Sequence, residues 1–172
     1  MKRISILFVL MGAIVGISSC KHESRSSSRG YNEQEIAFEG SNSFNQVKFT
    51  GGYNIELIQG ETESLSLMMK KESASDVKYW VEDSVLYVRN DTHGIRPEET
   101  HIKLKFKDLK RIQIEGGATL KSREPLQFDT LSIKLEGGAN LRLQLNVNHL
   151  YTYAAGGVNM ELTGTANSFE AI

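Results

Sequence analysis

The chain has 172 residues, of which 40% are hydrophobic and 24% are charged, and its formal net charge at pH 7 is −1. With 20 basic against 21 acidic residues and no basic stripe, these counts exclude a strongly basic protein built to bind nucleic acid. Cys20 is the one cysteine of the chain, which excludes an intramolecular disulfide framework.

The N-terminus has the features of an export signal. Lys2 and Arg3 precede an apolar run, 4–17, that is short and contains glycine. The ending Ile-Ser-Ser-Cys at 17–20 resembles the lipobox of bacterial lipoproteins, in which the signal is removed before a cysteine that becomes lipidated. A lipid anchor accounts for a lone exported cysteine, and several acyl chains hold a protein stably. We predict a signal peptide at 1–19 and membrane attachment through Cys20; an ordinary signal with an incidental thiol is the alternative.

Residues 20–35 are predicted to form a lipid-anchored tether. The stretch 21–30, KHESRSSSRG, is rich in serine and has no apolar residue, which is typical of a flexible linker. The charged residues 21–23 partly resemble the surface-display signal of Bacteroidetes lipoproteins. We therefore expect an outer-membrane lipoprotein of the cell envelope, on the surface or on the periplasmic face. Without its signal the chain carries 18 basic and 21 acidic residues.

Residues 36–172 are predicted to be one all-β domain. Nearly every apolar stretch alternates with period two and is bounded by Gly, Asn, Asp or Ser, as in 102–106, 131–135 and 141–143. The segment 72–80 alone is compatible with a turn of helix. Residues 36–107 have irregularly spaced strands, whereas 109–172 contain a repeat.

The repeat is a double glycine followed by an alternating strand pattern. It occurs at 51–57, 116–122, 137–143 and 156–162. The last three copies are 21 and 19 residues apart, a period typical of a solenoid whose units bury their apolar faces by stacking. We expect a single-stranded, right-handed parallel β-helix with coils of about 20 residues, in which Thr119, Asn140 and Asn159 form one column and Leu120, Leu141 and Met160 another. An antiparallel β-meander of hairpins is the alternative.

The glycine pairs are interpreted as corners that need positive φ. They are Gly51, Gly52, Gly116, Gly117, Gly137, Gly138, Gly156 and Gly157. Their backbone N–H groups could instead hold an anion, but no Lys or Arg recurs beside them. Residues 169–172 repeat the opening of a unit, so we expect either a chain that continues beyond Ile172 or a last coil completed by another chain through self-association.

The plan of residues 44–60, 81–88 and the GGA[TN]L units resembles the DUF2807 family of auto-transporter adhesin head domains (head GIN), which is common in Bacteroidetes lipoproteins. The similarity covers about residues 36–172. The turns differ from the family's usual Gly-Ser-Gly-Asp type, being Gly-Gly-Ala-Thr, Gly-Gly-Ala-Asn and Gly-Gly-Val-Asn. The resemblance implies a β-helix with an adhesive role and no established catalytic activity.

Catalytic and metal-binding patterns were sought because β-helices also carry polysaccharide-cleaving enzymes. Glu115 and Glu136 occupy equivalent positions before their glycines. If stacked, two carboxylates raise one pKa or recruit a cation; on a solvent-facing turn they diverge and do neither. The four histidines have no metal-ligand spacing and no nucleophile motif. We expect no catalytic residue, no metal site and no cofactor.

Aromatic side chains are the best candidates for ligand contact. Tyr151 and Tyr153 are predicted to face a ligand, while Trp80 and Tyr87 are expected to cover the core. The leading hypothesis is a lipid-anchored adhesion module of the cell envelope that binds a protein or a glycan and is not an enzyme. A structural or assembly unit of the envelope and a carbohydrate-active β-helix enzyme are the alternatives.

Overall fold

A computed structural model describes residues 31–70, 77–90 and 100–172. The predicted signal peptide, Cys20 and most of the predicted tether lie outside the described residues. Within these ranges the chain forms β-strands and one 3-10 turn, η1 (Gly40–Asn42), and no α-helix. The described part is therefore all-β, as the alternation of apolar residues predicts.

Twelve strands of the described residues form one sheet. Their bounds are β1 (Tyr31–Phe38), β2 (Gln46–Thr50), β3 (Tyr53–Gln59), β4 (Glu63–Lys70), β5 (Val77–Glu82), β6 (Val85–Asn90), β7 (Thr100–Phe106), β8 (Arg111–Glu115), β9 (Ala118–Ser122), β10 (Leu126–Glu136), β11 (Asn140–Ala155) and β12 (Asn159–Ala171).

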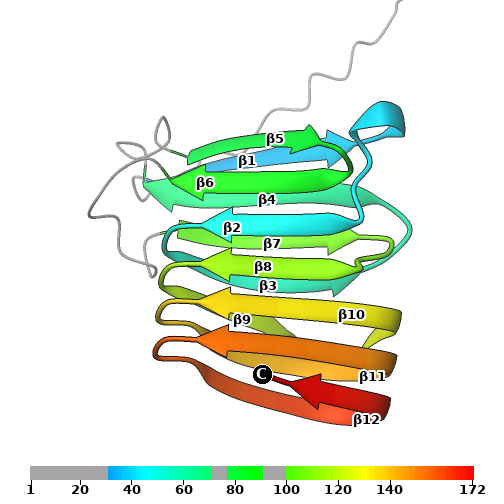
Figure 1. The fold of residues 1–172 in the computed structure, drawn as a ribbon. Coiled ribbons are helices and arrows are strands. Elements are labelled where there is room, and N and C mark those ends of the chain that lie inside the picture. Colours follow the sequence, from blue (N-terminus) through cyan, green and yellow to red (C-terminus); the bar gives the residue numbers. More distant parts are fainter. Residues whose placement is uncertain (1–30, 71–76, 91–99) are drawn as a thin grey trace, which may run out of the picture.

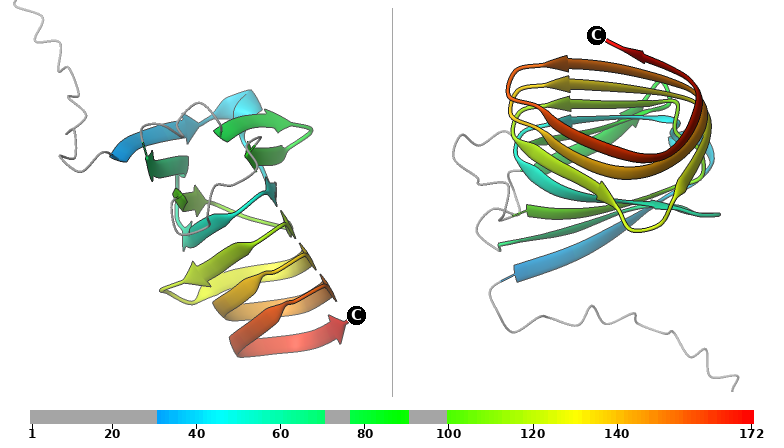
Figure 2. Two further views of the ribbon diagram at one scale, coloured as in Figure 1. Left: turned by 90° about the vertical axis from the view of Figure 1, so that its left-hand side faces the viewer. Right: turned by 90° about the horizontal axis from the view of Figure 1, so that it is seen from below.

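The sheet is curled, so that it has two walls facing each other across the core (Figures 1 and 2). The front wall of Figure 1 consists of β5, β6, β2, β8, most of β10 and the second part of β11. The back wall consists of β1, β4, β7, β3, β9 and the first part of β11. The long strands β10, β11 and β12 bend between the walls, which joins them into one surface (Figure 2).

Alternating side chains of both walls fill the space between them. In β2 the exposure pattern alternates around the buried Val47 and Phe49, and in β8 around Ile112 and Ile114. The rings of Phe106 and Phe128 stack with centroids 5.9 Å apart. Because successive strand residues point to opposite faces, each wall has one apolar inner face and one polar outer face.

Strands of successive repeat units pair in parallel and in register. Residue 133 of β10 lies opposite residue 112 of β8 and residue 152 of β11. On the back wall, Asn140 lies between Thr119 and Asn159, and Leu141 between Leu120 and Met160, so both predicted columns are confirmed. The antiparallel meander is therefore wrong for 109–172.

The first copy of the repeat, at 51–57, belongs to the same stack of parallel strands. β2 and β3, joined at the first glycine pair, lie in parallel beside β8 and β9, and β6 and β7 lie in parallel on their other side. The order of the coils in space therefore differs from their order in the sequence. Between β3 and β8 in the sequence, β4 lies outside the stack on β7, and β6 and β7 lie on the far side of β2 and β3.

The expectation of a parallel coil throughout 36–172 is wrong, because the sheet is mixed. β4 pairs antiparallel with both β1 and β7, and β5 pairs antiparallel with β6. The side chain of Gln34 in β1 donates a hydrogen bond of 3.2 Å to the hydroxyl of Tyr79 in β5, which links the two walls at this end. Residues 77–80 belong to strand β5, so the helical interpretation of 72–80 is wrong there; 71–76 lie outside the described residues.

The opposite end of the sheet is formed by β12. Within the described residues β12 pairs only with β11. Leu150 of β11 is 5% exposed, whereas Phe169, its partner in β12, is 58% exposed, and Ile172 is 77% exposed. Within the described residues the walls therefore end at the antiparallel strands β1 and β5 on one side, which the Gln34–Tyr79 hydrogen bond links, and at β12 on the other.

Candidate functional site

The first glycine of each pair forms a column along one edge of the stack. Gly51, Gly116, Gly137 and Gly156 have φ between +105° and +129°. A Cβ on Gly137 would lie 2.9 Å from the carbonyl oxygen of Gly116, and one on Gly156 would lie 2.6 Å from that of Gly137. The backbone of each corner thus lies directly on the corner of the next coil, where only glycine fits.

The second glycine of each pair has a different environment. Gly52, Gly117, Gly138 and Gly157 are not among the glycines with positive φ, and a Cβ on Gly138 or Gly157 would meet nothing within 4 Å. Gly164 of β12, which is outside the glycine pairs, has φ +121° and lies against the backbone of Leu145. Because the corners stack on one another's backbone, the paired glycines provide no evidence of an anion-binding site.

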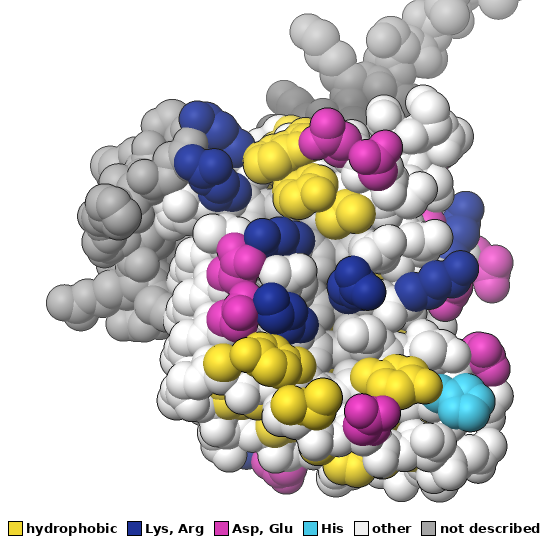
Figure 3. Space-filling model, viewed as in Figure 1, with side chains coloured by type: hydrophobic (Ala, Val, Ile, Leu, Met, Phe, Trp, Pro, Cys, Tyr) yellow, Lys and Arg dark blue, Asp and Glu magenta, His cyan; other side chains and the backbone are white. Residues whose placement is uncertain are grey.

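We call the outer face of the front wall the front face. It carries two rows of side chains that are in register across neighbouring strands. The longer row reads, from β5 to β11, Trp80, Tyr87, Lys48, Gln113, Lys134 and Tyr153. The second row reads, from β6 to β10, Arg89, Thr50, Glu115 and Glu136. Hydrophobic side chains gather at the top and bottom of this view, and charged ones lie between them (Figure 3).

An aromatic stack forms the β5–β6 end of the front face. The rings of Trp80 and Tyr87 lie 4.9 Å apart and 9° from parallel. Trp80 is 39% exposed, so the expectation that it covers the core is wrong. A hollow of about 290 Å³ lies between this stack and Glu115, and Lys48 and Thr50 also line it.

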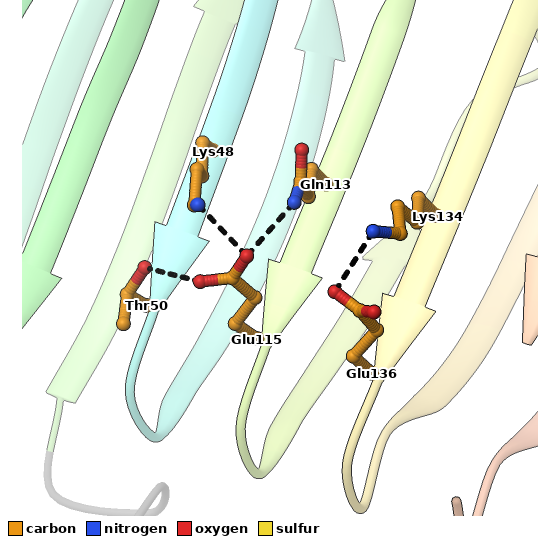
Figure 4. A network of polar contacts seen from close by, with 6 residues as sticks. All are labelled: Lys48, Thr50, Gln113, Glu115, Lys134 and Glu136. Carbon is orange, nitrogen blue, oxygen red and sulfur yellow. Dashed lines mark hydrogen bonds and ion pairs between the residues drawn. The ribbon is translucent and has the colours of Figure 1, made fainter. Parts of the chain in front are cut away.

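Glu115 is the centre of a polar network (Figure 4). Its Oε1 is 2.7 Å from Nζ of Lys48 and accepts a hydrogen bond of 2.8 Å from Gln113, while Thr50 donates to Oε2 at 3.4 Å. The hydrogen bond from Lys48 is the largest cause that lowers the pKa of Glu115 below its ordinary value. Lys48 belongs to β2 and Glu115 to β8, so this network joins the early copy of the repeat to the later ones.

The two equivalent glutamates lie in register on neighbouring strands. Each is held by a lysine: Nζ of Lys134 is 3.1 Å from Oε2 of Glu136 (Figure 4). A raised pKa is one possibility for stacked carboxylates, but the pKa of Glu115 is lowered, because the hydrogen bond from Lys48 outweighs the desolvation of the carboxylate. A general acid of a glycosidase needs a raised pKa, so the pair lacks that property at Glu115.

Tyr151 and Tyr153 lie on β11 at the other end of the front face and are 43% and 40% exposed. Nζ of Lys134 lies 5.6 Å from the ring centroid of Tyr153, a distance at which a cation and an aromatic face attract each other. The structure thus places both tyrosines at the surface. Tyr153 lies in the longer row, opposite Lys134, whereas Tyr151 lies opposite Ser132, outside both rows.

A second polar column lies at the bend of β10, β11 and β12. Asn148 donates a hydrogen bond of 2.8 Å to Asp129, and Asn167 donates one of 2.9 Å to Asn148. The hydrogen bond from Asn148 is the largest cause that lowers the pKa of Asp129. The spacing of 19 residues between these positions was the signal in the sequence, and such amide ladders stabilise stacked parallel strands.

Comparison with known families identifies the chain. Residues 43–172 match the family described as "putative auto-transporter adhesin, head GIN domain". The chain belongs to this family. A search of the curated proteins gave no match.

Solved structures with a similar fold come from Bacteroides and Parabacteroides species. A "putative adhesin" from Bacteroides fragilis has a TM-score of 0.73 at 20% identity over 81% of this chain. A "putative lipid binding protein" from Parabacteroides distasonis has a TM-score of 0.72 at 18% identity over 84% of this chain. The chain spans 65% of the length of the first and 63% of the second, which is less than two thirds of either.

The described residues contain no group of three or more His, Cys, Asp or Glu side chains able to hold a metal ion. Nor do they include a helix with the length and apolar character needed to cross a bilayer. The family is described by adhesion and not by a catalytic activity. The front face offers contact by aromatic rings and by hydrogen-bonding groups.

Proposed function

We propose that this protein is a lipid-anchored β-solenoid of the cell envelope that acts as an adhesion module through its front face. The observation that carries the proposal is the arrangement of exposed Trp80 and Tyr153 and half-buried Tyr87 around a hydrogen-bonded polar centre. Aromatic side chains that combine apolar area with polar groups are favoured in binding surfaces. Membership of a family described by adhesion agrees with this role.

The coil geometry supports presentation of such a face. We infer that the parallel units form a right-handed solenoid with coils of about 20 residues, consistent with the register offsets of 21 residues between β8 and β10 and 19 between β10 and β11. Equivalent residues then lie about 4.8 Å apart along the stack. The corner glycines hold this spacing, because a side chain at Gly116, Gly137 or Gly156 would push neighbouring coils apart.

The anchor follows from the N-terminal pattern. We propose that 1–19 is removed, that Cys20 is lipidated and that the following residues up to 30 tether the domain to the outer membrane, on the surface or the periplasmic face. Residues 31–35, predicted as part of the tether, pair with β4 as the first part of β1 and so belong to the domain. An adhesin must stay attached to its cell while its face meets a ligand. The serine-rich tether gives the domain freedom to reach one.

The test uses the full chain in a bacterial host that processes lipoproteins. Cells are labelled with an alkyne fatty acid, and their retention is measured on wells coated with mucin, matrix proteins or envelope polysaccharides. We expect the chain to carry the label and to retain cells on at least one coating. Cys20→Ala should remove both the label and the retention, since the protein leaves the cell. Equal retention of cells with and without the chain on every coating would contradict the proposal.

Assembly is a second candidate function, favoured by the edge of β12. Its backbone pairs on one side only within the described residues, and the apolar side chains of Phe169 and Ile172 are exposed. Unpaired strand edges and exposed apolar groups promote association of chains. Sedimentation of the full chain over a range of concentrations tests this candidate. A mass that rises with concentration and falls back for Phe169→Lys supports it, and a constant monomer mass contradicts it.

A carbohydrate-active enzyme is the weakest of the three hypotheses. Its best residue pair, Glu115 and Glu136, is bound to lysines on the same face. If the chain cleaved a polysaccharide and Glu136→Gln abolished the cleavage, the enzyme hypothesis would replace the adhesion proposal.

A further inference from the structure

We propose that the front face binds a neutral polysaccharide chain that lies across the strands, from the Trp80–Tyr87 stack to Tyr153. This inference rests on the proposed function, since it names the ligand class of the same face. Tyr87 and Tyr153 are four strand steps apart in one register row. At about 4.8 Å per step, the row is about 19 Å long. A row of this length and regular spacing fits a polymer of repeating units better than a small molecule.

The aromatic ends of the row suit pyranose rings. A pyranose has one apolar face of C–H groups, whose partial positive charge is attracted to the negative face of an aromatic ring. The parallel rings of Trp80 and Tyr87 are 4.9 Å apart, and Trp80 remains 39% exposed. The hollow of about 290 Å³ beside them gives one sugar ring contact with the stack and with Glu115. Tyr153, 40% exposed, provides the second contact at the far end.

The centre of the row suits hydroxyl groups. A sugar hydroxyl donates one hydrogen bond and accepts others, so it pairs with amides, carboxylates, ammonium groups and hydroxyls alike. Gln113, Thr50 and Glu115 supply these groups side by side at half-buried positions. Their mutual hydrogen bonds fix the side chains before a ligand arrives, which lowers the entropy lost on binding.

Charge pairing favours a neutral ligand over an acidic one. Lys48 and Lys134 are each neutralised by a carboxylate of the second row, at 2.7 Å and 3.1 Å. A negatively charged sugar that approached these two lysines would also approach the carboxylates of Glu115 and Glu136, which repel it. Arg89 adds a guanidinium at the β6 side of the face. Lys78 of β5 lies opposite Arg89, so two cations neighbour each other at that end. The ion-paired centre of the row offers polar contacts without the strong single-sign field that attracts a polyanion.

The experiment measures binding of the purified full chain to soluble glucan, mannan and polygalacturonate by affinity electrophoresis. Oligosaccharides of increasing length from the neutral polymer that binds are then titrated by calorimetry. We expect binding to at least one neutral polymer, little change with salt, and an affinity that rises until the oligosaccharide reaches from Tyr87 to Tyr153. Trp80→Ala should weaken binding at least about tenfold, and Tyr153→Ala by a smaller factor. Trp80→Phe should restore most of the affinity, which separates loss of contact from loss of folding.

Matched controls lie on the back wall. Met68→Ala removes an exposed side chain of β4, and Lys103→Gln removes an exposed charge of β7; neither should alter binding. Binding to polygalacturonate alone, with steep salt dependence, would overturn the assignment of a neutral ligand. Binding that Trp80→Ala and Tyr153→Ala leave unchanged would overturn the site. If no polysaccharide binds while cells displaying the chain are retained on protein coatings, this inference fails and the proposed adhesion stands.

Discussion

In residues 109–172 each strand pairs in parallel with a strand 19 or 21 residues away, whereas in residues 36–107 the partners are scattered and partly antiparallel. The repeat contributes coils of similar length, 21 and 19 residues. The first region contributes one such coil, β2–β3, together with strands that cover its end. The comparison teaches that equal spacing of the repeat extends the parallel part of the sheet, while the antiparallel strands lie at one end of it.

The largest expected effect concerns the stacking of the repeat. Gly137→Ala should lower the free energy of unfolding by about 3 kcal/mol, because it combines a positive φ with a Cβ only 2.9 Å from the oxygen of Gly116. Gly138→Ala is the matched control, with open space around its Cβ, and should change stability by less than about 1 kcal/mol. Urea denaturation of the full chain followed by circular dichroism measures both. Equal losses for the two variants would mean that the glycine column does not hold the coils together.

A smaller effect is expected in the first region, where single contacts take the place of repeated ones. Glu63 of β4 is 5% exposed and accepts hydrogen bonds from the hydroxyl of Ser43 at 2.5 Å and from the backbone N–H of Phe44 at 3.3 Å. Glu63→Ala should cost about 2 kcal/mol, since it leaves a buried N–H without its acceptor.

The same denaturation experiment includes two controls for this site. Glu63→Gln should lose less, because the amide oxygen still accepts, and Glu61→Ala, at an exposed position, should stay within about 0.5 kcal/mol of the wild type. If Glu63→Ala matched Glu61→Ala, the contact would contribute nothing to joining β4 to the segment before β2.

The smallest effect concerns the seam between the two regions, where Lys48 meets Glu115. The pKa of Glu115 in the folded protein lies below the ordinary value of 4.5. The carboxylate therefore stabilises the fold above pH 4.5, and this contribution is lost as the pH falls through the lowered pKa. At this half-exposed pair it should amount to less than about 1 kcal/mol.

Thermal unfolding of the wild type and Glu115→Gln between pH 7 and pH 3 measures this contribution. The wild type should be the more stable at pH 7, and the difference should shrink with acid. In a Lys48→Gln background most of the difference should vanish, because the largest cause of the lowered pKa is gone. A difference that stays constant with pH would show that the effect of the substitution is steric.

Much of the candidate site could be anticipated from residue spacing. Tyr151 and Tyr153 are both exposed, and their contact with a ligand stays a prediction. Trp80 and Tyr87 were assigned to the core because an aromatic residue in a strand usually covers it, and the stack they form depends on the antiparallel pairing of β5 with β6. The link between Lys48 and Glu115 joins residues 67 positions apart, so no local pattern predicts it.

By itself the sequence determined the all-β class, the parallel columns of 109–172 and the family, because period-two alternation and a repeat of about 20 residues act locally and equally in every unit. The tertiary structure alone decided that β2 and β3 lie between β6–β7 and β8–β9, and that antiparallel strands close that end. The physical reason is that one parallel coil fits against any other of the same shape. Which coil lies beside which then depends on the long-range packing of 60–107 and not on the pattern of each unit.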